Sequence, residues 1–168
     1  MSTPFWALTA AYWFHMLATV MWIGGLTVFA LVVLPSAQKI LEDSAFTLFI
    51  SQIHRRINLL GWLSIVVLTV SGMIQMSANK YYGGFLTFTG LWSRVILTKH
   101  ILFLIMAGIS GYITWSLFPA IQRAELLKPL EIRDQKTKQL QKRLHLVSTV
   151  NLLFGLVVLL LTAIARSV

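Results

Sequence analysis

The stretch Ala11–Pro35, AYWFHMLATVMWIGGLTVFALVVLP, decides the fold class of this chain. It is apolar for longer than a helix of a soluble protein requires, and at ~1.5 Å per residue it exceeds the ~30 Å hydrocarbon core of a bilayer. We therefore predict a membrane-spanning helix. His15 lies well inside this apolar run. Because an ionisable side chain at such depth is costly without a compensating partner, His15 is the first candidate functional residue.

Composition places the whole chain in the same class. Of its 168 residues, 57% are hydrophobic and only 11% are charged. The excess of apolar residues lies in four runs, each long enough to cross a membrane: about residues 5–34, 57–78, 91–118 and 144–165. We predict an all-α integral membrane protein, an antiparallel bundle of four transmembrane helices that forms one domain over residues 1–168.

Two connections between the predicted spans carry structure of their own. Ser36–Ile53 has apolar residues at helical spacing and is expected to form a short interfacial helix. Residues 121–143 are polar and charged, and we expect a helical hairpin or an extension of the neighbouring helices. The chain contains no cysteine, which excludes disulfides, thiolate metal sites, c-type haem attachment and iron–sulfur clusters.

The net charge of +9 is distributed in a way that predicts membrane orientation. Basic residues gather in the first and third connections, and the positive-inside rule places these in the cytoplasm and both termini outside. The residues concerned are Lys39, Arg55, Arg56, Arg123, Lys128, Arg133, Lys136, Lys138, Lys142 and Arg143. We expect a multi-pass protein of the plasma (inner) membrane whose partner is the lipid bilayer, with no nucleic-acid partner.

Each predicted span holds one of the four histidines. His15 and His100 lie at nearly the same distance from the ends of the first and third spans, so they share a level toward the outer face. His54 and His145 open the second and fourth spans and share a level near the cytoplasmic face. Histidines at one level across a four-helix bundle are typical of a six-coordinate haem b. A hydrogen-bonded structural histidine is the alternative, above all for His54 and His145.

The leading hypothesis from this pattern is a membrane cytochrome b with two bis-histidine haems. It would carry electrons across the membrane, with quinol or as a subunit of a redox complex that includes other membrane or periplasmic subunits; oxidoreductase activity is left open. Cations near each level would meet the haem propionates. These are Arg94 and Lys99 toward the outer face, and Arg55, Arg56 and Arg143 toward the inner face.

A second chemistry uses the methionines of the same spans. Thioether and imidazole ligands suit Cu(I), although methionine in a membrane helix is more often an apolar filler. The candidates are Met16, Met21, Met73, Met76 and Met106. No acidic residue lies inside a predicted span, so a carboxylate proton relay or a hydrolytic metal site has no support.

Short motifs give the chain a family resemblance. His15 with Trp22-Ile23-Gly24-Gly25 resembles the first helix of the CopD copper-resistance membrane domain, and Trp92-Ser93-Arg94 through Lys99 resembles its third. The stretches Arg56-Ile57, Leu68–Gly72 and Arg143 resemble parts of its second and fourth helices. This resemblance implies copper transport. His100 and His145 depart from the pattern, and Asn151 stands where an acidic residue is expected.

The wider superfamily suggests a third function. It includes HemJ-type protoporphyrinogen oxidases, haem-associated proteins in which a first-helix histidine and a third-helix lysine matter. His15 and Lys99 match those two positions. The resemblance therefore implies protoporphyrinogen oxidation as a further alternative, with dependence on Lys99.

Overall fold

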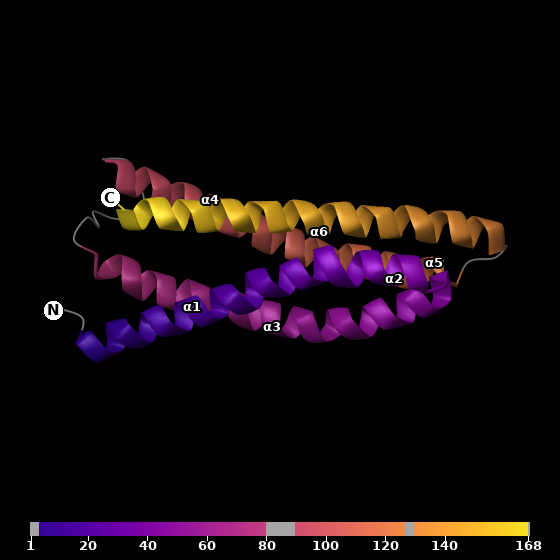
Figure 1. Cartoon of the computed structure of the whole chain (residues 1–168), viewed down its shortest axis with the longest axis horizontal. Helices are drawn as coiled ribbons and strands as arrows, with labels where there is room; N and C mark the ends of the chain where they lie inside the picture. Colours follow the sequence, from indigo (N-terminus) through magenta and orange to yellow (C-terminus); the bar gives the residue numbers. More distant parts are fainter. Residues whose placement is uncertain (1–3, 80–89, 127–129, 168) are drawn as a thin grey trace.

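The structure is a computed structural model that describes residues 4–79, 90–126 and 130–167. Four long helical segments lie side by side, and both chain ends lie at the same end of the molecule (Figure 1). The segments are α1 (Phe5–Val28) with η1 (Phe29–Val33) and α2 (Leu34–Ile40); α3 (Asp43–Ser77); α4 (Leu91–Tyr112) with η2 (Ile113–Leu117) and α5 (Phe118–Ala124); and α6 (Leu130–Ser167). The predicted all-α membrane class is confirmed.

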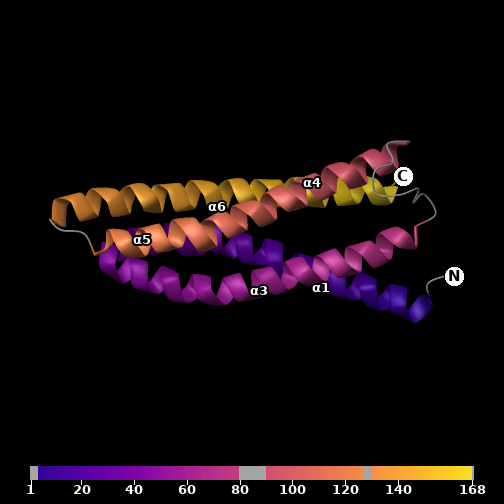
Figure 2. The same cartoon turned by 180° about the vertical axis from the view of Figure 1, so that it is seen from behind.

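Two ends of the bundle are distinguished below. The termini end is where α1 and α4 begin and α3 and α6 finish, and the hairpin end is where α2 and α5 finish and α3 and α6 begin (Figures 1 and 2). Each of the four segments contains a stretch long and apolar enough to cross a membrane. The helices extend past the predicted spans at the hairpin end, because α2, α3, α5 and α6 each continue into the polar connections. That residues 1–168 form one domain stays a prediction.

The first and third helical segments each contain a π-helical turn that ends two residues before a proline. In η1 the N–H of Leu34 donates to the carbonyl of Phe29, and in η2 the N–H of Phe118 donates to the carbonyl of Ile113. Pro35 and Pro119 follow, and they lack the N–H that a regular helix would need at that point. The wider turn lets each helix continue past its proline.

The predicted interfacial helix over Ser36–Ile53 is wrong. α2 continues the first span to Ile40, the chain turns at Leu41, and α3 then runs unbroken into the second span. The centre of the apolar stripe that suggested an interfacial helix is buried within the protein, whereas Ile40 and Phe49 are exposed. Phe46 and Ile50 are each 1% exposed and belong to the core cluster at the hairpin end.

Packing within the bundle is antiparallel, and it is most extensive between α1 and α3 and between α4 and α6. Gln75 of α3 reaches the carbonyl of Ala11, while His54 lies near Phe29 much farther along α1. Large apolar side chains remain exposed on the outer faces of all four segments, as in Val20, Leu59, Leu104 and Leu160. In a membrane protein this is the surface that lipid tails cover.

Candidate functional site

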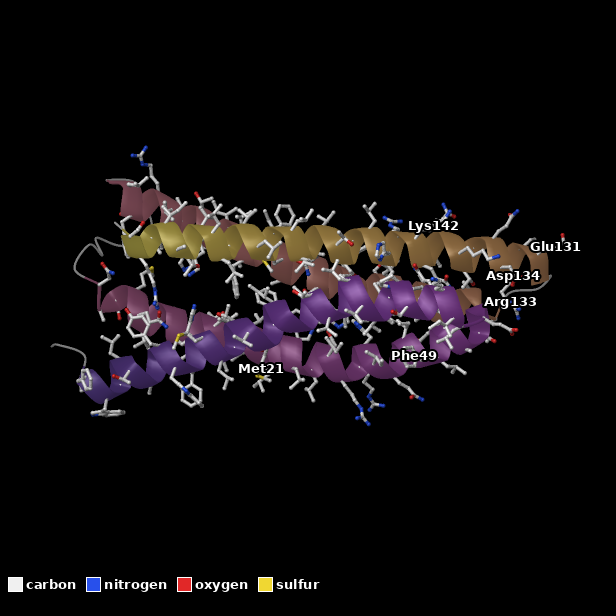
Figure 3. All side chains as sticks on the ribbon, in the orientation of Figure 1. Met21, Phe49, Glu131, Arg133, Asp134 and Lys142 are labelled. Carbon is white, nitrogen blue, oxygen red and sulfur yellow. The ribbon has the colours of Figure 1, made fainter. Side chains whose placement is uncertain are left out.

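A cavity of about 50 Å³ lies near mid-length of the bundle, between all four helical segments. Met21 lies toward one end of its lining, and His54 lies at the other, beside Phe29. Because Met21 and Phe29 are eight residues apart on one continuous helix, the lined stretch is ~12 Å long. At ~10–15 Å³ per water, the cavity holds about three to five water molecules. Met21 is labelled in Figure 3.

One side of the cavity is polar, which is unusual at this depth in a membrane bundle. The hydroxyl of Thr114 lies 2.7 Å from Asn58 Oδ1 and 2.8 Å from the Ser110 carbonyl. The amide of Asn151 donates to Ser110 Oγ at 3.1 Å. These contacts connect α3, α4, η2 and α6 through neutral oxygen and amide groups. Ser148 also lines the cavity.

Within the described part of the chain, several polar atoms around this cavity have no hydrogen-bond partner. They include Ser148 Oγ, Asn151 Oδ1 and His54 Nε2. Ser148 is 1% exposed and Asn151 is fully buried, so bulk water cannot satisfy them. A buried polar atom without a partner costs ~1–3 kcal/mol. The cavity is therefore suited to water or to a ligand that supplies donors and acceptors.

His54 is held by stacking rather than by hydrogen bonds. Its ring lies 3.7 Å from the ring centroid of Phe118 with 14° between the planes, and Phe29 is 6.1 Å away on another side. These contacts orient the imidazole so that it lines the cavity. His145, its predicted partner, is not among the cavity-lining residues, and its buried Nδ1 has no hydrogen-bond partner.

His15 is bonded to the neighbouring helix α3. Its Nδ1 lies 2.9 Å from Ser71 Oγ, and the Ser71 hydroxyl donates to the carbonyl of Val67 at 2.6 Å. Because that donation uses the serine hydrogen, Ser71 Oγ accepts from His15 Nδ1–H. This leaves His15 Nε2 with a free lone pair, the form in which imidazole binds a metal or accepts a proton.

His100 has the same tautomer as His15. Its Nδ1 lies 2.7 Å from the carbonyl of Ile96, and a carbonyl can only accept. A hydrogen bond from one ring nitrogen to a backbone carbonyl is also what orients many metal-binding histidines. No hydrogen bond or ring contact joins His15 to His100 in the described part of the chain. Their roles as haem ligands stay predictions.

The level shared by His15 and His100 follows from contacts at Gly155 of α6. A Cβ atom there would lie 3.2 Å from Met106 Cε and 3.7 Å from Ile23 Cγ1, so α4 and α1 meet α6 at one level. His15 lies eight residues from Ile23 toward the termini end, and His100 lies six from Met106. At ~1.5 Å per residue, the two histidines are within ~3 Å of a common level.

Among the predicted basic site residues, Lys99 is the one close enough to His15 to act on it electrostatically. Lys99 and Arg166 both act electrostatically on His15. Arg94 instead lies 3.4 Å from the carbonyl of Gly90 at the start of its own helix. Arg55 and Arg56 are exposed. Arg143 places its guanidinium carbon 5.5 Å from the ring centroid of Tyr112.

The methionines differ in what they can reach. Met76 is 9% exposed and Met106 is 1% exposed, whereas Met73 is 50% and Met16 is 52% exposed. Only Met21 among the five lines the cavity. Among the described residues there is no group of three or more His, Cys, Asp or Glu side chains that could hold a metal ion. Any metal in the bundle would need methionine or neutral oxygen ligands as well.

Sequence reasoning missed the polar lining and Arg166 as site residues. Ser110 and Thr114 are four residues apart, and Ser148 and Asn151 are three apart, within otherwise apolar helices. That spacing places each pair on one helix face and would have indicated a polar site. Arg166 gave no such signal, because it stands at the end of an apolar run.

Comparison with protein-family models gives one match. The model described as copper resistance protein D matches residues 51–165, which is about two thirds of the chain. The matched region covers α4, α6 and most of α3, and residues 1–50, including His15, lie outside it. Comparisons with curated proteins and with solved structures gave no match.

Proposed function

Because the chain belongs to the copper resistance protein D family, we propose that it carries Cu(I) through the bundle by way of the cavity between Met21 and His54. The observation that carries this proposal is the cavity itself. A thioether lies toward one end of it, and an imidazole nitrogen without a hydrogen-bond partner lies at the other. Thioether and imidazole are soft and borderline ligands that suit Cu(I).

The polar side of the cavity supports passage of an ion. A cation entering the hydrocarbon core loses its hydration, which is costly unless the protein supplies ligands. Asn58, Ser110 and Thr114 present neutral oxygen atoms along the cavity. Copper, as the cargo, needs sites that bind it weakly enough to release it. Neutral groups at mid-membrane meet that requirement better than a cluster of carboxylates.

His15 and Met76 are the candidate first ligands at the termini end. Gly72 is in contact with the His15 ring, since a Cβ atom there would lie 3.4 Å from His15 Cε1, and Met76 is one helical turn farther along α3. Met76 is buried, whereas Met73 is half exposed on the lipid-facing surface. We therefore assign the role to Met76 and not to the pair of methionines. We also propose that the termini end faces outside the cell.

This arrangement gives the haem hypothesis no support. His54 is the one histidine among the described residues that line the cavity, and His145, its predicted partner, is not among them. At the termini end, the His15 ring is turned toward Ser71 and Gly72 of α3. The protoporphyrinogen oxidase alternative retains one observation in its favour, the proximity of Lys99 to His15. It predicts turnover of that porphyrinogen and loss of turnover in Lys99→Met.

Copper uptake into proteoliposomes tests the proposal. Liposomes containing the purified protein are loaded with a membrane-impermeant Cu(I) chelator dye, and Cu(I) is supplied outside with ascorbate. We expect uptake above that of protein-free liposomes. His54→Phe keeps an aromatic ring against Phe118 but removes the nitrogens, and it should lower the initial rate at least about tenfold.

Matched methionine variants serve as controls. Met21→Leu and Met76→Leu should lower uptake, because Met21 lines the cavity and Met76 is buried. Met16→Leu and Met73→Leu should retain it, because these side chains are about half exposed and do not line the cavity. Uptake equal to that of protein-free liposomes would refute copper transport. An absorption spectrum of the reduced protein is recorded in parallel. A haem α-band that disappears in the double variant His15→Ala/His100→Ala would overturn the proposal in favour of the cytochrome.

A further inference from the structure

The termini end of the bundle brings two cationic side chains, Lys99 of α4 and Arg166 of α6, close to His15 of α1. The guanidinium carbon of Arg166, on α6, lies 5.4 Å from the ring centroid of Tyr12 on α1. His15 is three residues beyond Tyr12 on the same helix, so the two lie on one face. The cation–π contact therefore holds Arg166 beside the turn of α1 that carries His15.

Lys99 reaches the same place from α4. Met106 of α4 and Ile23 of α1 both lie next to Gly155 and mark a common level. Lys99 lies seven residues from Met106, and His15 lies eight residues from Ile23, both toward the termini end. Lys99 and His15 are therefore level to within ~1.5 Å. Consistent with this placement, Lys99 and Arg166 influence each other electrostatically, and both influence His15. Lys99 is only partly exposed.

These cations have no acidic side chain at their end of the molecule. All five Asp and Glu residues of the sequence belong to connections or helix starts at the hairpin end: Glu42, Asp43, Glu125, Glu131 and Asp134. Figure 3 shows Glu131 and Asp134 at the end opposite the termini. The ion pair that the described residues do form, Arg133 with Asp134, is also there. Arg166 is exposed, but Lys99 is only partly exposed. A partly buried cation without a counter-ion is costly, so the arrangement calls for an external anion.

The depth of the cluster indicates which anion is available. Between Arg143 and Arg166, α6 carries no Lys, Arg, Asp or Glu. At ~1.5 Å per residue this uncharged stretch is ~33 Å long, close to the ~30 Å hydrocarbon core. Arg166 therefore lies at the boundary of the hydrocarbon, where lipid headgroups begin. Phosphate oxygens are at that level, and arginine and lysine both bind them.

We infer that Lys99 and Arg166 form a phosphate-binding site beside His15, at the termini end of the bundle. Lys99 and Arg166 neutralise the phosphate charge, and Tyr12 keeps the guanidinium in position. The phosphate belongs either to a lipid headgroup that enters between α1, α4 and α6 or to a free phosphate compound. The site does not depend on copper transport.

Two probes distinguish these sources. In the first, the protein is released from phosphatidylglycerol nanodiscs, and native mass spectrometry counts the lipids that each chain retains. In the second, delipidated protein in neutral detergent is unfolded by heat with inorganic phosphate or with chloride at equal ionic strength. Both cations are removed in the double variant Lys99→Met/Arg166→Met. The control is Arg94→Met, which removes a different cation at the same end of the bundle.

We expect wild type and Arg94→Met to retain phosphatidylglycerol, and the double variant to retain at least about tenfold less. If the lipid is retained but inorganic phosphate does not stabilise the protein, the site binds a headgroup. If phosphate stabilises the protein but no lipid is retained, the site binds a free phosphate. Equal results for wild type and the double variant with both probes would overturn the inference. Far-UV circular dichroism and gel filtration establish that the double variant is folded. If the double variant is not folded, the single variants Lys99→Gln and Arg166→Gln are measured instead.

Discussion

Enlarging the side chain at Gly155 tests the packing from which the levels of His15 and Lys99 were deduced. A Cβ atom at Gly155 would lie 3.2 Å from Met106 Cε and 3.7 Å from Ile23 Cγ1. Ordinary carbon–carbon contacts are ~3.5–4.0 Å. Met106 is 1% exposed, so its terminal methyl has little room to move away.

Two opposing effects set the size of the change. Replacing a helical glycine by alanine gains ~1 kcal/mol of helix propensity, and overpacking a filled core costs ~1–3 kcal/mol. For Gly155→Ala the two nearly cancel. Gly155→Leu forces a branched side chain between three helices and should lower the free energy of unfolding by ~2–3 kcal/mol. Gly108 has no heavy atom within 4 Å of an added Cβ, so Gly108→Ala should be stabilising.

The assay is unfolding by SDS in mixed micelles, followed by far-UV circular dichroism. We expect Gly108→Ala to be more stable than wild type, Gly155→Ala to be similar to it, and Gly155→Leu to be less stable. Met106→Ala introduced into Gly155→Leu should recover part of the loss, because it opens space next to the new side chain. If Gly155→Leu is as stable as Gly108→Leu, then α1, α4 and α6 do not meet at Gly155, and the levels deduced from that contact are wrong.

Three further outcomes follow from the structure. Because the chain has no cysteine, single-cysteine variants report orientation: a membrane-impermeant maleimide should label Ser167→Cys on intact cells and Lys142→Cys only after lysis, and the opposite pattern would reverse the proposed topology. Ser71→Ala removes the acceptor of His15 Nδ1–H and should lower the free energy of unfolding by ~1 kcal/mol in the same micelle assay. Asn151→Leu should reduce copper uptake several-fold while leaving the protein folded, since it removes a polar group next to the cavity; unchanged uptake would exclude the polar side from the path.

The positions of the spans and the levels of the histidines were predictable, because both follow from apolar runs and the rise of a helix. The neighbours of each histidine were not. His15 forms a hydrogen bond with Ser71 of α3, and such a contact depends on the rotation of each helix about its axis. Helices that are apolar all round carry no amphipathic signal of that rotation. The sequence therefore indicated the depth of His15 and His100 but not their hydrogen-bond partners, and their pairing around a haem stays a prediction.

The interfacial helix predicted over Ser36–Ile53 was wrong for a different reason. Ser36–Ile53 shows an amphipathic pattern, which correctly indicates a helix with one buried face. The pattern does not say whether that face meets lipid headgroups or protein. Here Phe46 and Ile50 meet Leu117 and Leu144 in the core cluster at the hairpin end. The neighbouring π turns depend on Pro35 and Pro119, whose presence allows either a kink or a wider turn.

The phosphate site and the copper path interact through charge. Two unit charges ~8 Å apart at an effective dielectric constant of ~20 interact by ~2 kcal/mol. Lys99 and Arg166 would each raise the free energy of Cu(I) at His15 by an amount of this order, and a bound phosphate would cancel most of it. Copper uptake should therefore be about tenfold or more faster in vesicles of anionic phospholipid than in vesicles of a phosphate-free glycolipid. The double variant Lys99→Met/Arg166→Met should lose this difference, because it removes both the repulsion and the phosphate. A lipid dependence that persists in that variant would show that surface potential, and not this site, governs the approach of Cu(I).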